Sequence, residues 1–158
     1  MTAVLFPLTF AVAAPFWALM ILLPRWSWTR RIVTSPLIVL PVVVIYALLV
    51  LPALATVLPE VADPDLEGIR AFLGTADGAA AAWAHMIAFD LFVGRWAWLD
   101  GTDRGIPIWL MSPLLVLTIL LGPLGLGAYL LVRTRYRAAL QRTSPDPAPV
   151  GPTSKEHA

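Results

Sequence analysis

The sequence predicts an all-α integral membrane protein: a bundle of four transmembrane helices with short loops and a disordered, proline-rich C-terminal tail. Hydrophobic residues make up 59% of the chain and charged residues 13%, whereas soluble domains carry about twice that charged fraction. Mean hydropathy is +0.78. Three long runs, residues 1–24, 32–59 and 105–132, contain no Asp, Glu, Lys or Arg. Each is long enough to cross a hydrocarbon core of about 30 Å as a helix.

The element boundaries follow from these runs and from the polar segments between them. We expect spans at about residues 4–24, 36–58, 78–99 and 108–132 in a membrane domain of residues 1–137, followed by a disordered tail at residues 138–158. The first run has no basic segment before it and no small-residue cleavage site after it, so it reads as a span rather than a secretory signal.

The loops of the predicted bundle are short. The loop between the second and third spans is acidic, and a short interfacial helix at residues 66–73 fits there. Asp65 is its expected N-cap and Gly74 its expected stop. Residues 100–105 are expected to form a tight polar turn between the third and fourth spans.

Charge and cysteine content narrow the function classes. The formal net charge is +1 and there is no cysteine, which argues against a nucleic-acid partner, a disulfide framework and a thiolate site. With four spans, five basic residues fall on one side of the membrane (Arg25, Arg30, Arg31, Arg95, Arg104) and six on the other (Arg70, Arg133, Arg135, Arg137, Arg142, Lys155). The positive-inside rule therefore does not decide the orientation of the protein in the membrane. Only the cluster of tail arginines favours a cytoplasmic C-terminus.

The third span carries the candidate site. His85, Asp90 and Arg95 lie within an otherwise apolar helix, where an ionisable residue costs about 2.5–3.5 kcal/mol on insertion scales and marks function by default. At about 100° per residue, Asp90 lies on a different face from His85, so the three cannot form a triad within one helix. Their partners must come from other spans, and Tyr46 and Thr118 are the first to consider.

An aromatic stripe accompanies His85 on the same helix. His85, Phe89, Phe92 and Trp96 fall within about 40° of one another. We expect a groove for a hydrophobic ligand to be formed by Trp83, Phe89, Phe92, Trp96 and Tyr46.

Each candidate residue could instead have a structural role. Asp90 could be a buried hydrogen-bonding group, and His85 and the stripe could serve helix packing. Arg95 could reach the membrane interface or pair with Asp100 or Asp103. Three glycines, Gly122, Gly125 and Gly127, are expected to permit close helix contact. The sequence contains two histidines and none of the usual metal or nucleotide motifs, so no metal and no cofactor are expected.

Several motifs together resemble the abscisic-acid-deficient 4-like family of small four-span membrane proteins. The resemblance runs from about residue 5 to residue 133. Its motifs are Pro15-Phe16-Trp17, Trp83-Ala84-His85 with Asp90-Leu91-Phe92 and Arg95, and Gly122-Pro123-Leu124-Gly125. The family is known for a requirement in neoxanthin formation in plants. The resemblance implies chemistry on violaxanthin, in which an epoxide end group becomes an allene.

Such a step needs an acid at the epoxide oxygen and a base for a carbon-bound proton. The matching positions would be His85 and Asp90, with Arg95 as an electrostatic helper. The expected function is therefore in carotenoid or isoprenoid metabolism, either as a cofactor-independent isomerase or as an accessory. The alternative is a non-enzymatic scaffold, assembly subunit or small conduit. Expected partners are the lipid bilayer, a hydrophobic isoprenoid ligand, and membrane proteins or a second copy. The expected location is a bacterial cytoplasmic membrane.

Overall fold

A computed structural model describes residues 1–143. All regular secondary structure in this part of the chain is helical, which confirms the all-α part of the predicted class. The elements are α1 (Thr2–Leu22), α2 (Ser27–Thr34), η1 (Pro36–Val39), α3 (Leu40–Val50), η2 (Leu51–Ala53), α4 (Leu54–Ala62), α5 (Leu66–Leu73), α6 (Ala76–Asp103) and α7 (Ile108–Thr143).

Three segments of the described chain are long and apolar enough to cross a membrane: Thr2–Leu22, Pro36–Ala62 and Ile108–Tyr136. The fourth predicted span, within α6, does not meet the same measure because polar and charged residues interrupt it. By length and composition, three segments of the described chain could cross a membrane, whereas the sequence predicts four. The second segment is a series of short helices, since a 3-10 turn at Pro52 separates α3 from α4.

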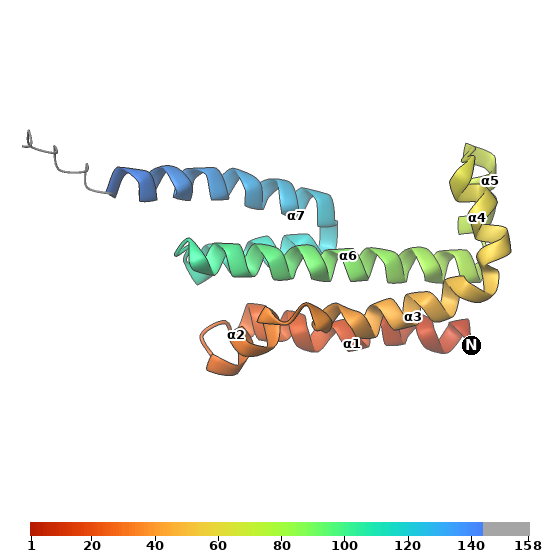
Figure 1. Ribbon diagram of the computed structural model, residues 1–158, viewed down its shortest axis with the longest axis horizontal. Coiled ribbons are helices and arrows are strands. Elements are labelled where there is room, and N and C mark those ends of the chain that lie inside the picture. The colour runs from red at the N-terminus through yellow and green to blue at the C-terminus, as the bar shows by residue number, and fades with distance from the viewer. Residues whose placement is uncertain (144–158) are drawn as a thin grey trace, which may run out of the picture.

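The long central helix α6 organises the molecule. It packs against α1, α3 and α7 (Figure 1). Its contact faces are built from small residues, including Ala80, Ala84 and Ala97, which let neighbouring backbones approach closely. Gly94 is the extreme case, because a Cβ there would overlap the indole of Trp17. The tryptophan of the Pro15-Phe16-Trp17 motif thus docks against α6, where it is buried.

Helix α7 is a hairpin rather than a rod. Leu121 has non-helical torsions (φ −144°, ψ 57°), and the chain turns back there (Figure 1). The two arms of the hairpin are the parts of α7 before and after Leu121, and their contacts with α6 show where each arm lies. Met111 lies beside Gly101, Gly122 lies beside Asp90, and Tyr129 reaches back to Asp100. Both arms therefore run along the C-terminal half of α6, and the tip of the hairpin lies near its middle.

Two glycines make this reversal possible. A Cβ at Gly125 would collide with the backbone of Thr118 on the first arm, and a Cβ at Gly122 would collide with the carboxyl of Asp90. Around Gly127 there is open space. The expectation of close contact is confirmed for Gly122 and Gly125 and is wrong for Gly127, which points away from the protein.

The ends of α6 differ from the expected boundaries. At its start, Thr75 caps the helix, and Thr2 donates a hydrogen bond to Asp77 that ties α1 to it. At its end, the helix continues through the predicted polar turn to Asp103, because Arg104 pairs back to Asp100 one turn earlier (2.7 Å). The actual turn is formed by residues 104–107, with Gly105 at φ +68°.

The remaining expectations concern the acidic loop and the tail. The helix α5 has the predicted bounds, and the Asp65 carboxylate accepts hydrogen bonds from the backbone N–H groups of Glu67 (3.0 Å) and Gly68 (2.9 Å). Gly74 follows its last residue as predicted. Helix α7 extends to Thr143, six residues into the predicted tail. Residues 144–158 of that tail lie outside the described residues.

Candidate functional site

His85 lies on the exposed face of α6, next to α3. Its ring stacks on Phe89 with 4.7 Å between centroids, and the Tyr46 ring of α3 lies 5.7 Å away. The structure thus brings His85 together with Tyr46, one of the two partners considered from the sequence. Thr118, the other one, is buried and donates to the carbonyl of Leu114 (2.9 Å) within its own helix.

A shallow apolar groove lies along α6, next to Phe89, on which the His85 ring stacks. It has a volume of about 290 Å³ and is lined by Phe89, Phe92 and Ala88 of α6 with Val39 and Val43 of the preceding segment. Phe89 and Phe92 are both exposed. In a bilayer this face would meet lipid, so an apolar chain could enter the groove sideways from the membrane.

The groove is not lined by the other expected residues, Trp83, Trp96 and Tyr46, nor by His85. Trp83 packs against Phe6 of α1, with ring centroids 5.7 Å apart. Trp96 contacts Tyr129 edge-on at 5.4 Å. The stripe is continuous on the helical wheel, but the second arm of α7 covers it at Trp96 and leaves it open at His85, Phe89 and Phe92.

Asp90 faces the hairpin, away from His85. Its carboxyl lies against Gly122, the first residue after the break in α7. Asp90 therefore packs against the tip of the hairpin, where a side chain at position 122 would displace it. His85 and Asp90 do not share a cavity, and a single acid–base pair made from these two side chains does not fit this geometry.

Arg95 caps the C-terminal end of helix α2. Its guanidinium donates to the carbonyls of Val33 (2.8 Å), Thr34 (2.5 Å) and Ser35 (3.2 Å) at the C-terminus of α2. Carbonyls at that position lack helical partners, and a cation there is also favoured by the dipole. The expected pairing of Arg95 with Asp100 or Asp103 is therefore wrong. Those carboxylates bind Arg104, Arg133 and Arg30 instead.

The strongest polar cluster of the molecule was not predicted. Asp100 accepts hydrogen bonds from Arg104 (2.7 Å), Arg133 (2.8 Å) and Tyr129. Arg133 also lies 5.7 Å from the ring centre of Trp96. Burial alone would raise the pKa of Asp100, but the hydrogen bonds from Arg133, Arg104 and Tyr129 outweigh it and hold the pKa well below its usual range. All donors are engaged with one carboxylate, so the cluster is suited to joining α6 to α7.

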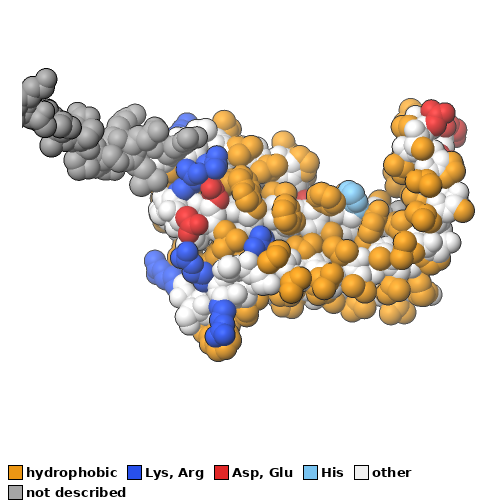
Figure 2. Space-filling model, in the orientation of Figure 1, with side chains coloured by type: hydrophobic (Ala, Val, Ile, Leu, Met, Phe, Trp, Pro, Cys, Tyr) orange, Lys and Arg blue, Asp and Glu red, His pale blue; other side chains and the backbone are white. Residues whose placement is uncertain are grey.

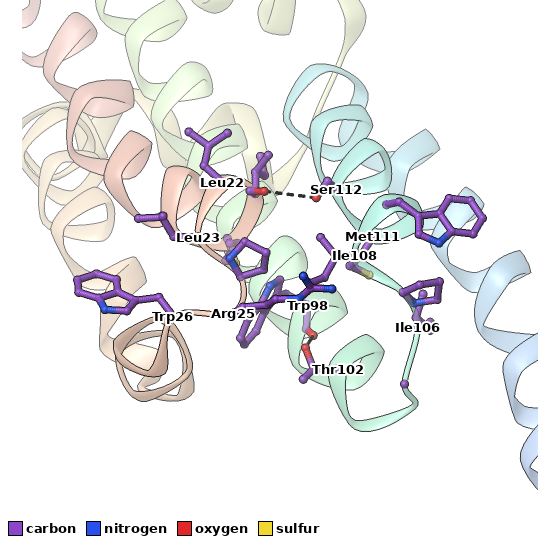
Figure 3. Close-up of a pocket in the computed structure, with 16 residues that line it drawn as sticks. Leu22, Leu23, Arg25, Trp26, Trp98, Thr102, Ile106, Ile108, Met111 and Ser112 are labelled. Atoms are coloured by element: carbon purple, nitrogen blue, oxygen red, sulfur yellow. Dashed lines mark hydrogen bonds between the residues drawn. The ribbon is translucent and has the colours of Figure 1, made fainter.

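A cavity lies at the end of the bundle where this cluster is found, and neither His85 nor Asp90 lines it. It has a volume of about 810 Å³ and lies between the end of α1, the end of α6 and the start of α7 (Figure 3). Ser112 and Thr102 line it, but their hydroxyls donate to the carbonyls of Ile21 (3.3 Å) and Trp98 (2.7 Å). Arg25 is its charged lining residue. The cavity offers an apolar volume with one cation and few free polar groups.

Metal binding finds no support in the described part of the chain. Within residues 1–143, no three side chains among His, Asp and Glu lie close enough together to hold an ion. The side chains beside the groove are the imidazole of His85 and the phenol of Tyr46.

Comparisons with known proteins identify the family. The model of the ABA DEFICIENT 4-like family matches residues 4–129. Protein ABA DEFICIENT 4, chloroplastic, from Arabidopsis thaliana is 30% identical over 98 residues, which are 58% of this chain and 44% of that protein. The match thus spans less than half the length of this curated relative. No solved structure matches the chain significantly. Because the family match covers most of the sequence, this chain belongs to the ABA DEFICIENT 4-like family.

Proposed function

We propose that this protein acts in the membrane on a carotenoid-type isoprenoid, and that His85 with Tyr46 forms the reactive end of its binding groove. The family relation supports a neoxanthin-formation-like role. The observation that carries the proposal is that the rings of His85 and Tyr46, with centroids 5.7 Å apart, lie next to an open apolar groove, because His85 stacks on the groove residue Phe89. A long polyene would lie in the groove and present its polar end group to the pair.

The proposed reaction is an isomerisation that needs no cofactor. The C–O bond at the epoxide carbon attached to the polyene breaks, and the oxygen gains a proton. The adjacent polyene carbon loses its proton, and that electron pair forms the second double bond of the allene. Atoms and electrons balance within the substrate. An imidazole can donate and accept protons near neutral pH, and a phenol can donate a hydrogen bond to the developing alkoxide. His85 is the proposed acid–base group and Tyr46 the proposed hydrogen-bond donor.

Asp90 and Arg95 take supporting roles in this proposal. Asp90 packs against Gly122 at the tip of the α7 hairpin, and Arg95 donates hydrogen bonds to carbonyls at the end of α2. Both would position the helices that form the groove. Their replacement would then affect stability first and product formation second.

The test is a pigment profile in a host that accumulates violaxanthin. Wild type, His85→Phe, Tyr46→Phe and Met86→Leu would be expressed at equal membrane levels. Phe at position 85 preserves the stacking with Phe89, and Met86 is an equally exposed neighbour on α6 outside the groove. We expect a new product with wild type and Met86→Leu, none with His85→Phe, and a reduced amount with Tyr46→Phe.

The outcomes separate the proposed enzyme from other roles. An unchanged product level with His85→Phe would remove the imidazole from the mechanism. Identical profiles with and without the wild-type protein would contradict the proposal for this substrate.

A further inference from the structure

The hairpin of α7 changes which side of the membrane its C-terminal arm reaches. A straight helix would carry residue 133 to the opposite end of the bundle from residue 108. Here both positions lie near the end of α6, because Met111 touches Gly101 and Arg133 binds Asp100 at 2.8 Å. The tip of the hairpin lies beside Asp90, near the middle of α6.

Because of this reversal, most basic side chains of the described chain lie at one end of the bundle and most acidic side chains lie at the other. At one end lie six arginines: Arg25, Arg30, Arg31, Arg104, Arg133 and Arg135. Three of them, Arg30, Arg104 and Arg133, pair with the carboxylates Asp103 and Asp100 at the same end. The opposite end, formed by α4 and α5, carries Arg70 and most of the acidic residues: Glu60, Asp63, Asp65, Glu67 and Asp77. Figure 2 shows the basic side chains gathered at one end of the molecule with a few acidic side chains among them, a second group of acidic side chains at the tip of the other end, and a hydrophobic surface between the two ends.

Tryptophans mark the same basic end. Trp26, Trp28 and Trp109 are 49%, 51% and 74% exposed, and Arg31 lies 5.2 Å from the ring centre of Trp28. Exposed Trp and Arg together are typical of a protein surface at the level of lipid headgroups. The exposed leucines near the tip of the hairpin, including Leu120 and Leu124, suit the hydrocarbon region.

We propose that residues 108–143 form a re-entrant hairpin that enters and leaves the membrane through one face, and that this basic face binds the anionic headgroups of the cytoplasmic leaflet. α1, the segment Pro36–Ala62 and α6 then cross the membrane. Basic residues remain on the cytoplasmic side, and each one near an anionic surface adds attraction to it. The helix breaks at Leu121, which would lie at membrane depth. Leu121 itself is 52% exposed, but the next residue, Gly122, packs against Asp90, and non-helical backbone at that depth needs protein beside it.

The absence of cysteine from the chain makes single-cysteine labelling a direct test. Ser27→Cys reports on the basic end, Leu66→Cys on the acidic end and Thr134→Cys on the second arm of α7; all three positions are exposed. Each variant would be labelled with a membrane-impermeant maleimide in spheroplasts and in inverted vesicles, with labelling after denaturation as the total. We expect Ser27→Cys and Thr134→Cys to react in inverted vesicles and Leu66→Cys to react in spheroplasts.

Two results would overturn the proposal. If Thr134→Cys labels from the same side as Leu66→Cys, α7 crosses the membrane once and the hairpin is wrong. If the Ser27 and Thr134 variants both label from the outside, the orientation is wrong. Neither result depends on catalytic activity.

A second measurement tests the anionic partner itself. Thermal unfolding would be compared in nanodiscs of phosphatidylcholine and of a mixture with phosphatidylglycerol. We expect the mixture to raise the Tm of wild type and of Arg70→Gln, a control at the acidic end, and to raise that of Arg25→Gln/Arg31→Gln less. An equal rise in all three proteins would contradict a specific role for the basic face.

Discussion

Replacing Gly125 with alanine should loosen the hairpin of α7, whereas the same change at Gly127 should not. The new methyl group at position 125 would overlap backbone atoms of Thr118, which cannot move without shifting the first arm. Overpacking of this kind costs about 1–3 kcal/mol, and the better helix propensity of alanine returns up to about 1 kcal/mol. We therefore expect a net loss of about 1–2 kcal/mol in the free energy of unfolding.

Gly127→Ala provides the matched control. It makes the same substitution half a turn away, into open space, so only the propensity gain of up to about 1 kcal/mol remains. Thermal unfolding of the purified protein in detergent would show a Tm lowered by about 2–8 °C for Gly125→Ala and unchanged or raised for Gly127→Ala. Equal Tm values for the two variants would refute the packing of the hairpin arms.

Three further predictions concern the polar contacts of α6. Asp100→Asn should cost about 2 kcal/mol, because hydrogen bonds to a charged group are lost and two arginines are left side by side; chemical denaturation measures this, and a change below about 0.5 kcal/mol would contradict it. Since the folded-state pKa of Asp100 is lowered, its stabilising contribution should be complete above about pH 5 and fade as the pH falls below about 4. The difference in free energy of unfolding between wild type and Asp100→Asn should therefore narrow as the pH falls below about 4. A difference that stays constant would argue against the ion cluster. Arg95→Lys should increase amide exchange in the residues that follow α2, because one ammonium cannot replace a guanidinium that reaches three carbonyls; lost activity with unchanged exchange would instead favour a direct catalytic role.

The helical membrane class could be predicted from the sequence because it depends on composition and on the length of uncharged runs. Those quantities need no knowledge of how helices pack. The cap of α5 was equally accessible, since Asp65 and Gly74 act within a few residues of the helix they bound. The separation of His85 from Asp90 followed from helical geometry alone.

The reversal of α7 could not be predicted from apolar run length, because both arms read as one continuous span. One local signal was present: the Gly122-Pro123 pair is a typical helix breaker, but membrane helices often tolerate such pairs. The Asp100 cluster depends on this reversal, since only the returning arm brings Tyr129 and Arg133 to the end of α6. The role of Arg95 was missed for a similar reason, because its acceptors are backbone carbonyls of another helix.

Activity of the purified protein would test the central proposal most directly. Wild type and His85→Phe would be reconstituted separately into liposomes that contain violaxanthin, with no other protein present, and the pigments would be separated after incubation. We predict that neoxanthin accumulates with wild type and not with His85→Phe, while circular dichroism shows the same helix content for both. Absence of the product with wild type, or equal product with His85→Phe, would contradict direct acid–base catalysis at the His85 groove.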